Sequence, residues 1–151
     1  MNTVNQWAGI SFNSRDPVYS QVVRLFKEKI VTGVIQSGQT IPSRRELAAQ
    51  LKINPNTAQR AYKEMEDQGL IVTEGNSPSR VTLDLDVLAQ IRAELLGSAV
   101  EAFVASIRNI DVPLNELLHV VQQVYTKAQT EISQKSPEDS CDSVRGGKND
   151  D

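Results

Sequence analysis

Two helix-start signals stand eleven residues apart in the chain, at Ser43 and at Asn54, and this short spacing constrains the fold more than any other feature. Three residues after Ser43 comes Glu46, and such a pair forms a capping box in which each side chain accepts a hydrogen bond from the other residue's backbone amide. Asn54 is a favoured N-cap, and Pro55 after it suits the first helical position because proline has no N–H group to leave unpaired. The segment 44–68 therefore predicts a short helix and a longer helix joined by a tight turn.

The short helix is expected over residues 44–51, and the longer helix is expected to run from Asn54 to about Gln68 with two faces of different character. The face expected to join the core carries Ala58, Ala61, Tyr62 and Met65. The opposite, polar face carries Asn56, Gln59, Arg60 and Lys63. Because these polar side chains can donate hydrogen bonds, the outward face has the chemistry that reading the edges of DNA bases requires.

Further signals surround these two helices. An earlier helix is expected between Pro17 and Gly33, because proline suits a first turn and glycine suits the left-handed position after a helix end. Residues 70–73 and 80–83 are β-branched runs separated by turn-forming residues, which predicts a β-hairpin. A helix, a helix-turn-helix and a hairpin in this order predict a winged helix-turn-helix domain over residues 10–83.

Residues 84–133 predict two further helices, of which the first ends near Asn109 and the second begins near Pro113. Each carries an apolar stripe that one helix cannot bury alone, so the stripe must pack on a second subunit or on the same chain. We predict a two-helix C-terminal dimerisation arm, with a core inside the same chain as the alternative. The residues expected at the dimer interface are Leu88, Ile91, Leu95, Phe103, Leu117, Val121 and Val124. Residues 134–151 are polar and are predicted to be a disordered tail, so the chain as a whole is predicted to be mostly α-helical with one small β-hairpin.

Composition argues against several other classes of protein. The 151 residues contain no apolar run that approaches the roughly 20 residues of a membrane-spanning helix. The first twelve residues lack the basic and apolar regions of a secretory signal, so we expect a cytoplasmic protein with no membrane partner. Cys141 and His119 are the single cysteine and the single histidine, too few for a transition-metal site. Because no phosphate-binding glycine loop or set of catalytic side chains is apparent either, we expect no enzyme activity, no metal and no cofactor.

Charge is distributed unevenly along the chain. Residues 15–82 carry ten Lys and Arg against seven Asp and Glu, whereas the remainder carries six against twelve. The net charge of −3 hides this difference. A basic front suits the phosphate backbone of DNA, and an acidic back suits a different partner.

Several runs of residues, in their order and spacing, resemble the GntR family of bacterial repressors. They are residues 16–21 (Asp-Pro-Val-Tyr-Ser-Gln), 33–38 (Gly-Val-Ile-Gln-Ser-Gly), 41–48 (Ile-Pro-Ser-Arg-Arg-Glu-Leu-Ala) and 54–62 (Asn-Pro-Asn-Thr-Ala-Gln-Arg-Ala-Tyr). The resemblance covers about residues 16–74, and the Asn-Pro-Asn-Thr helix start followed by only two helices is similar to the YtrA subfamily. In the family, the wing usually carries a basic, glycine-rich tip. The corresponding residues 74–81 here keep one glycine and begin with an acid, Glu74.

The resemblance implies which side chains contact DNA. Arg45, at the start of the short helix, is expected to contact DNA, while Arg44 beside it is equally suited to pairing with an acid. In helix-turn-helix proteins the N-terminal end of the second helix enters the major groove, and Asn54 is expected to cap that helix rather than to read bases. The predicted DNA contacts are Arg44, Arg45, Asn56, Thr57, Gln59, Arg60, Lys63 and Arg80.

The resemblance further implies a homodimeric repressor that binds a double-stranded, inverted-repeat operator, with an operon for an ABC-type transporter as its suggested target. The sequence does not identify a small-molecule effector. Two alternatives stay open. One is a winged-helix protein-interaction module that uses its helical arm to bind a protein partner, and the other is ligand-gated repression, which needs a cavity.

Overall fold

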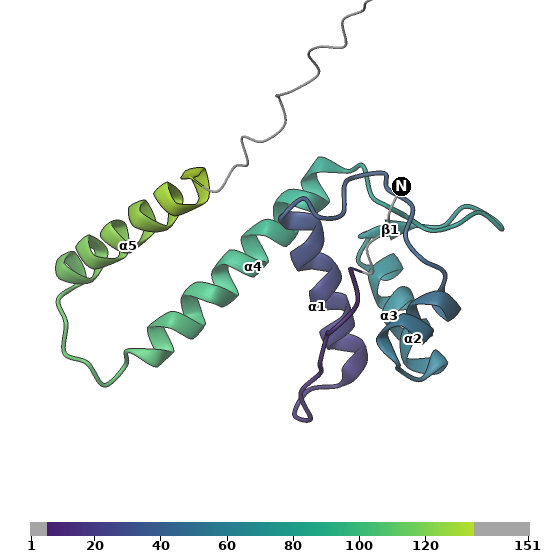
Figure 1. Ribbon diagram of the computed structural model, residues 1–151, viewed down its shortest axis with the longest axis horizontal. Helices are drawn as coiled ribbons and strands as arrows, with labels where there is room; N and C mark the ends of the chain where they lie inside the picture. The colour runs from purple at the N-terminus through teal and green to yellow at the C-terminus, as the bar shows by residue number, and fades with distance from the viewer. Residues whose placement is uncertain (1–5, 135–151) are drawn as a thin grey trace, which may run out of the picture. The chain divides into compact units, whose positions relative to one another are not determined.

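The computed structural model describes residues 6–134, and its elements follow the predicted order (Figure 1). They are helices α1 (Val18–Val31), α2 (Arg44–Leu51) and α3 (Pro55–Asp67), strands β1 (Ile71–Val72) and β2 (Arg80–Val81), and helices α4 (Leu85–Ser106) and α5 (Leu114–Gln134). The predicted class, mostly helical with a small β-hairpin, is confirmed. Except for Gln134, the tail predicted to be disordered lies outside the described residues. Among the helices of residues 6–134, none combines the length and the hydropathy needed to cross a bilayer.

Side-chain caps define the turn between α2 and α3. Ser43 Oγ accepts a hydrogen bond from the Glu46 amide at 3.2 Å, and the Glu46 carboxylate accepts one from the Ser43 amide at 3.1 Å, which confirms the capping box. Asn54 Oδ1 accepts a hydrogen bond from the Asn56 amide at 2.8 Å, so Asn54 caps α3 as predicted. Between the two helices, Lys52 has a φ of 55°, a left-handed conformation that ends α2 abruptly. These local contacts fix where the exposed end of α3 begins.

The core of the first unit lies where α1 packs against α3. Phe26 of α1 and Tyr62 of α3 are fully buried, and their rings meet edge to face with 6.3 Å between centroids. The side chains predicted for the apolar face of α3 are all buried: Ala58, Ala61, Tyr62 and Met65. Trp7 joins the same core, although it precedes the boundary predicted at residue 10, and its ring lies 4.7 Å from that of Phe26. Because burial of an aromatic ring of this size is strongly stabilising, the N-terminal segment is part of the domain.

The wing has shorter strands than predicted, since β1 contains only Ile71 and Val72 and β2 only Arg80 and Val81. The two strands pair antiparallel, with Ile71 opposite Val81. Residues 38–41 lie along the other edge of β2, where the Gly38 amide donates to the Val81 carbonyl at 2.9 Å and the Val81 amide donates to the Gln39 carbonyl at 3.0 Å. The base of the wing is therefore hydrogen-bonded on both sides, and one side is the segment that leads into α2.

Helix α4 belongs to the same compact unit as the winged helix, and this unit extends to Ser106. Ile91 is 5% exposed and lies in the core cluster, and Leu88 and Leu95 pack against that cluster. Ile91 is therefore part of a core inside its own chain. The prediction that Ile91 lies at a dimer interface is wrong, and the alternative of an intramolecular core applies to it. The predicted boundary between residues 83 and 84 separates segments that pack together, because the apolar side chains of Leu88, Ile91 and Leu95 pack on the core to which α1 contributes.

An ion pair that the sequence did not suggest joins α1 to α4. Lys27 on α1 is 7% exposed, and its Nζ lies 3.0 Å from Glu94 Oε1 and 3.2 Å from Glu94 Oε2 on α4. A buried lysine requires a paired carboxylate, because removing an unpaired charge from water is costly. The pair therefore helps to fix α4 against α1.

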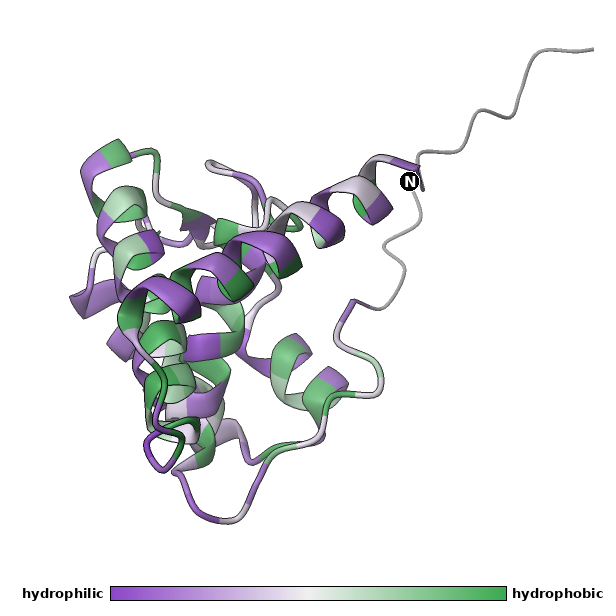
Figure 2. Cartoon of the chain, turned by 90° about the vertical axis from the view of Figure 1, so that its left-hand side faces the viewer, coloured by the Kyte–Doolittle hydropathy of each residue, from purple (hydrophilic) through white to green (hydrophobic). Residues whose placement is uncertain are grey.

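Helix α5 lies in a second unit, which begins at Ile107. None of the residues of α5 is buried, and apolar and hydrophilic residues are mixed along the helices (Figure 2). The exposed apolar side chains of α5 are Leu114, Leu118, Val120, Val121, Val124, Tyr125 and Ile132. Of the residues predicted for a dimer interface, Phe103 on α4 is exposed, as are Val121 and Val124, while Leu117 is half-buried. The dimer interface itself stays a prediction.

Candidate nucleic-acid interface

The N-terminal turn of α3 presents polar side chains directly after the turn from α2. Asn56 and Gln59 are exposed, and Thr57 is half-buried. Within residues 6–134, the side-chain amides of Asn56 and Gln59 make no hydrogen bond. An Asn or Gln amide offers one donor side and one acceptor, which is the pattern that pairs with the major-groove edge of adenine. This end of α3 therefore has the chemistry to read bases.

Arg45 lies in the first turn of α2, close in sequence to the cap at Ser43. It is exposed, and in the part of the chain that the structure describes no carboxylate lies within ion-pair distance of its guanidinium. The adjacent acid, Glu46, is engaged in the capping box. A planar guanidinium of this kind suits a phosphate, with which it can form two parallel hydrogen bonds.

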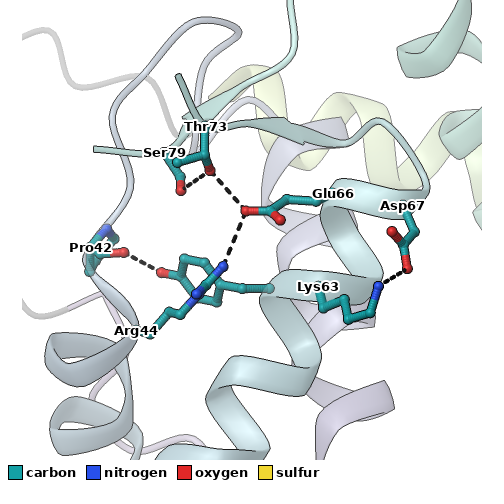
Figure 3. A network of polar contacts seen from close by, with 8 residues as sticks. Pro42, Arg44, Lys63, Glu66, Asp67, Thr73 and Ser79 are labelled. Carbon is teal, nitrogen blue, oxygen red and sulfur yellow. Dashed lines mark hydrogen bonds and ion pairs between the residues drawn. The ribbon is translucent and has the colours of Figure 1, made fainter. Parts of the chain in front are cut away.

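Arg44 has intramolecular partners instead (Figure 3). Its Nη2 atom lies 3.3 Å from Glu66 Oε1, and its guanidinium carbon lies 5.7 Å from the centroid of the Tyr62 ring. The Tyr62 hydroxyl donates a hydrogen bond to the Pro42 carbonyl oxygen, and burial raises the pKa of this hydroxyl well above its ordinary value. The Tyr62 ring is thus held in place as a surface on which Arg44 can rest.

Three further predicted contacts lie along α3 and on β2. The Arg60 guanidinium lies over the Tyr19 ring of α1, 3.8 Å from its centroid, in a cation–π arrangement. Lys63 Nζ lies 3.2 Å from Asp67 Oδ2 in an exposed pair along the helix. Because exposed pairs contribute at most about 1 kcal/mol, Lys63 can exchange Asp67 for a phosphate at little cost. Arg80 is exposed on β2, at the base of the wing.

Two hydroxyl groups close the neck of the wing and connect it to α3. Thr73 Oγ1 and Ser79 Oγ, on either side of residues 74–78, lie 2.6 Å apart. Thr73 Oγ1 also donates a hydrogen bond to Glu66 Oε1 at 2.9 Å. Figure 3 shows Glu66 between Arg44 on one side and the two hydroxyls on the other. The wing is therefore connected to the helix-turn-helix by side chains as well as by the backbone.

Sequence reasoning missed the roles of Glu66 and Tyr19. Helical spacing places Glu66 near the end of α3, but its partner Arg44 lies 22 residues earlier in the chain. Tyr19 belongs to the expected first helix, and no local pattern connects it to Arg60. Only the packing of α1 and α2 against α3 brings these side chains together.

Within residues 6–134 the structure contains no cluster of three or more His, Cys, Asp or Glu side chains that could hold a metal ion. His119 is exposed on α5, and Cys141 lies outside the described residues.

A winged helix in which α3, here called the reading helix, exposes polar side chains defines the class of DNA-binding winged-helix proteins. Comparisons with known proteins give the family. Residues 18–81 match the family described as bacterial regulatory proteins, gntR family. The chain is 29% identical over 111 residues to YhcF of Bacillus subtilis, an HTH-type transcriptional regulator, which covers 74% of this chain and 92% of YhcF. It is 43% identical over 60 residues to the HTH-type transcriptional repressor YtrA of Bacillus subtilis, covering 40% of this chain and 46% of YtrA.

Solved structures give the same result over a longer stretch. A GntR family transcriptional regulator from Listeria monocytogenes has a TM-score of 0.67 and 29% identity, covering 74% of this chain and 98% of that chain. A transcriptional regulator from Oenococcus oeni has a TM-score of 0.63 and 29% identity, covering 78% and 98%. The chain therefore carries a helix-turn-helix domain of the GntR family. The family and these relatives are transcriptional regulators, not enzymes, and the predicted winged-helix fold with two C-terminal helices is confirmed.

Proposed function

We propose that this chain binds an inverted-repeat operator as a homodimer and represses transcription. The observation that carries the proposal is the exposed N-terminal end of α3, where the side-chain amides of Asn56 and Gln59 have no hydrogen-bond partner among the described residues. Contacts from such amides to base edges specify sequence, and contacts from arginines to phosphates fix the protein on the duplex. Arg45, in the first turn of α2, is proposed to supply one such phosphate contact.

The remaining predicted contacts support this arrangement around the reading helix. Thr57 is half-buried and is proposed to contact a phosphate or a thymine methyl group. Arg60 and Lys63 follow on α3, and Arg80 lies on the wing, where each is proposed to contact the DNA backbone. Because these contacts go to phosphates, they contribute affinity for any DNA, and specificity depends on the first turn of α3.

The dimer is proposed to form through apolar side chains of α4 and α5. Phe103 is 41% exposed near the end of α4, and Val121 and Val124 are exposed on α5. Exposed apolar patches of this kind mark interaction surfaces, and a two-fold dimer presents two copies of α3 to two half-sites of an inverted repeat. Ile91 is excluded from this interface because it is buried within its own chain.

Footprinting with DNA fragments from upstream of the gene tests the proposal, and one protected inverted repeat is the expected result. Affinity should fall steeply as salt increases, since each phosphate contact releases counterions. A flat dependence of log K on log salt would reject DNA binding.

A pair of substitutions separates DNA binding from the protein-interaction alternative. Arg45→Ala should weaken DNA binding and reduce the slope of log K against log salt by about one. Arg24→Ala provides the matched control, because Arg24 is exposed on α1, pairs with Glu28 at 3.1 Å and is not among the predicted DNA contacts. Equal affinities for both variants would favour the protein-interaction module.

Repression and its target are proposed from the relatives. YtrA, the 43% identical relative, is named a transcriptional repressor. The resemblance to its subfamily suggests an operon for an ABC-type transporter as the target. Deleting the gene should raise the amount of transcript of the controlled operon, as measured by RNA sequencing. A fall in that transcript would identify an activator instead.

The ligand-gated alternative has little support among the described residues. A cleft of about 330 Å³ between α1, α3 and α4 is lined by ten residues, and four of its polar side chains are paired with one another. Lys27 binds Glu94, and the Gln68 side-chain amide donates to Glu64 at 2.8 Å. The cleft therefore offers a ligand few unsatisfied polar groups, and our proposal includes no effector.

A further inference from the structure

We propose that Glu66 is a positioning residue for DNA recognition. Its carboxylate holds the Arg44 guanidinium and the neck of the wing, defined here as Thr73 and Ser79, in one arrangement that favours operator DNA over other sequences. The inference rests on the proposed function, in which α2, α3 and the wing contact DNA.

One carboxylate oxygen connects three elements of the domain (Figure 3). Glu66 projects from the last turns of α3, and its Oε1 atom lies 3.3 Å from Arg44 Nη2 at the start of α2. The same oxygen accepts the hydrogen bond from Thr73 Oγ1, directly after β1, at 2.9 Å. Displacing Glu66 would therefore release the start of α2 and the neck of the wing together.

The hydrogen bonds in the neck have a single consistent direction. A carboxylate only accepts, so the one hydroxyl hydrogen of Thr73 points to Glu66. Thr73 has no second hydrogen to give to Ser79, and therefore the Ser79 hydroxyl donates to Thr73 Oγ1 across their 2.6 Å separation. The two sides of the wing are thus ordered by the acceptor on α3, in the sequence Ser79 to Thr73 to Glu66.

Because the Arg44 and Glu66 side chains are partly exposed, their effect on the position of the DNA contacts can be distinguished from an effect on the stability of the fold. The Arg44 and Glu66 side chains are 45% and 32% exposed, and ion pairs in such surroundings contribute little to folding. Loss of the pair should leave the fold intact and change where Arg44 and the wing lie. Loss of an ordinary surface ion pair would change neither the position of an arginine that contacts DNA nor the position of the wing.

Two consequences for DNA binding follow from the loss of Glu66. An unpaired Arg44 is free to contact any phosphate, which strengthens binding to DNA of unrelated sequence. A wing with a loosened neck no longer holds residues 74–78 at a fixed distance from α3, which weakens binding to the operator. Both effects reduce the ratio of operator affinity to affinity for unrelated DNA.

Glu66→Gln in the full chain tests the first consequence, with the footprinted operator fragment and a duplex of random sequence and equal length as probes. The affinity ratio should fall by roughly fivefold, the effect of about one hydrogen bond. The slope of log K against log salt for the random duplex should become steeper by about one. Thr73→Val breaks the wing branch without changing charge, so the ratio should fall while the slope stays the same.

Glu28→Gln is the matched control, because it makes the same change of charge in an exposed ion pair with Arg24 on α1. Its affinity ratio should equal that of the wild-type protein. The proposal is overturned if Glu66→Gln keeps the wild-type ratio, or if Glu28→Gln lowers the ratio as much as Glu66→Gln.

Amide hydrogen exchange in the free protein gives a measurement that needs no DNA. The Ser77 amide donates to the Glu74 carbonyl at 2.9 Å, and the Ile41 amide donates to the Ser79 carbonyl at 2.9 Å. Both amides should exchange faster in Glu66→Ala, which removes the acceptor that Gln would keep, and in Thr73→Val, whereas the amides of α1 should be unchanged. Unchanged exchange at Ser77 and Ile41 overturns the role of Glu66 by itself, while a wild-type protein that protects no DNA overturns the proposed function.

Discussion

Helices α3 and α5 both carry an apolar side at helical spacing, but they differ in what covers that side. α3 buries its four apolar-face residues against α1 and the strands, around the fully buried Tyr62. No residue of α5 is buried within the described part of the chain. The polar side of α3 is therefore the side proposed to contact DNA, whereas in α5 it is the apolar side that is proposed to contact a second subunit. An amphipathic pattern shows that one face is to be covered and leaves open which molecule covers it.

The largest effect on stability is expected in the core against which α3 packs. Phe26→Ala should lower the free energy of unfolding by about 3–5 kcal/mol, because Phe26 is fully buried between Trp7 and Tyr62. Urea denaturation followed by circular dichroism measures the loss. The control is Tyr125→Ala on α5 at low protein concentration, which should cost less than about 0.5 kcal/mol. A similar loss for both variants would mean that α5 is also packed, and the contrast would disappear.

The second effect concerns the assembly rather than the fold. Phe103→Asp should weaken the dimer by about 2 kcal/mol or more, since it places a charge in the proposed interface, and sedimentation velocity should then show monomer at concentrations where the wild type is dimeric. Gln90→Asp places the same charge at an exposed polar position of α4 and should leave the dimer unchanged. A dimeric Phe103→Asp protein would remove Phe103 from the interface.

A smaller effect is expected at the start of α2. Ser43→Ala removes the acceptor for the Glu46 amide and should cost about 1 kcal/mol in the free energy of unfolding. Thermal denaturation of Ser43→Ala and of the conservative variant Ser43→Thr measures it, and the threonine hydroxyl should recover most of the loss. Equal stability of the alanine variant and the wild type would show that the cap does not stabilise α2.

The smallest effect is expected in the turn itself. Lys52→Gly should raise stability by at most a few tenths of a kcal/mol, because relief of the left-handed strain, about 1 kcal/mol, is nearly offset by the entropy that glycine loses on folding. Lys52→Ala is the control, since alanine keeps the Cβ atom and should gain nothing. A clear loss of stability for Lys52→Gly would mean that the lysine side chain itself stabilises the turn.

The parts of the fold that could be predicted from the sequence are those set by local contacts. The bounds of α2 were predicted at residues 44–51 because the capping box involves residues three apart. Three features could not be predicted from the sequence: the contribution of Trp7 to the core, the pairing of residues 38–41 with β2, and the buried ion pair of Lys27 with Glu94. The last of these joins residues 67 positions apart, and such contacts depend on how helices pack rather than on any local pattern.

The candidate interface shows the same division between local and distant contacts. Asn54 as a cap and the exposure of Asn56 and Gln59 follow from the helix start and from helical spacing. Whether an arginine is free or engaged does not follow from these signals, and Arg44 and Arg45 show this most clearly. They are neighbours of the same type, yet within residues 6–134 only Arg44 is paired with an acid, because Glu66 of α3 lies against it.

The position of Trp7 has a practical consequence for spectroscopy. It is the single tryptophan of the chain, and it lies against Phe26 with Lys29 Nζ 5.2 Å from its ring centroid. Its fluorescence is therefore a built-in signal from the interior of the DNA-binding domain, with no indole on α5 to add to it. Intrinsic emission thus reports the folding of this domain without an attached dye, and a label placed on α5 can report subunit association separately in the same sample.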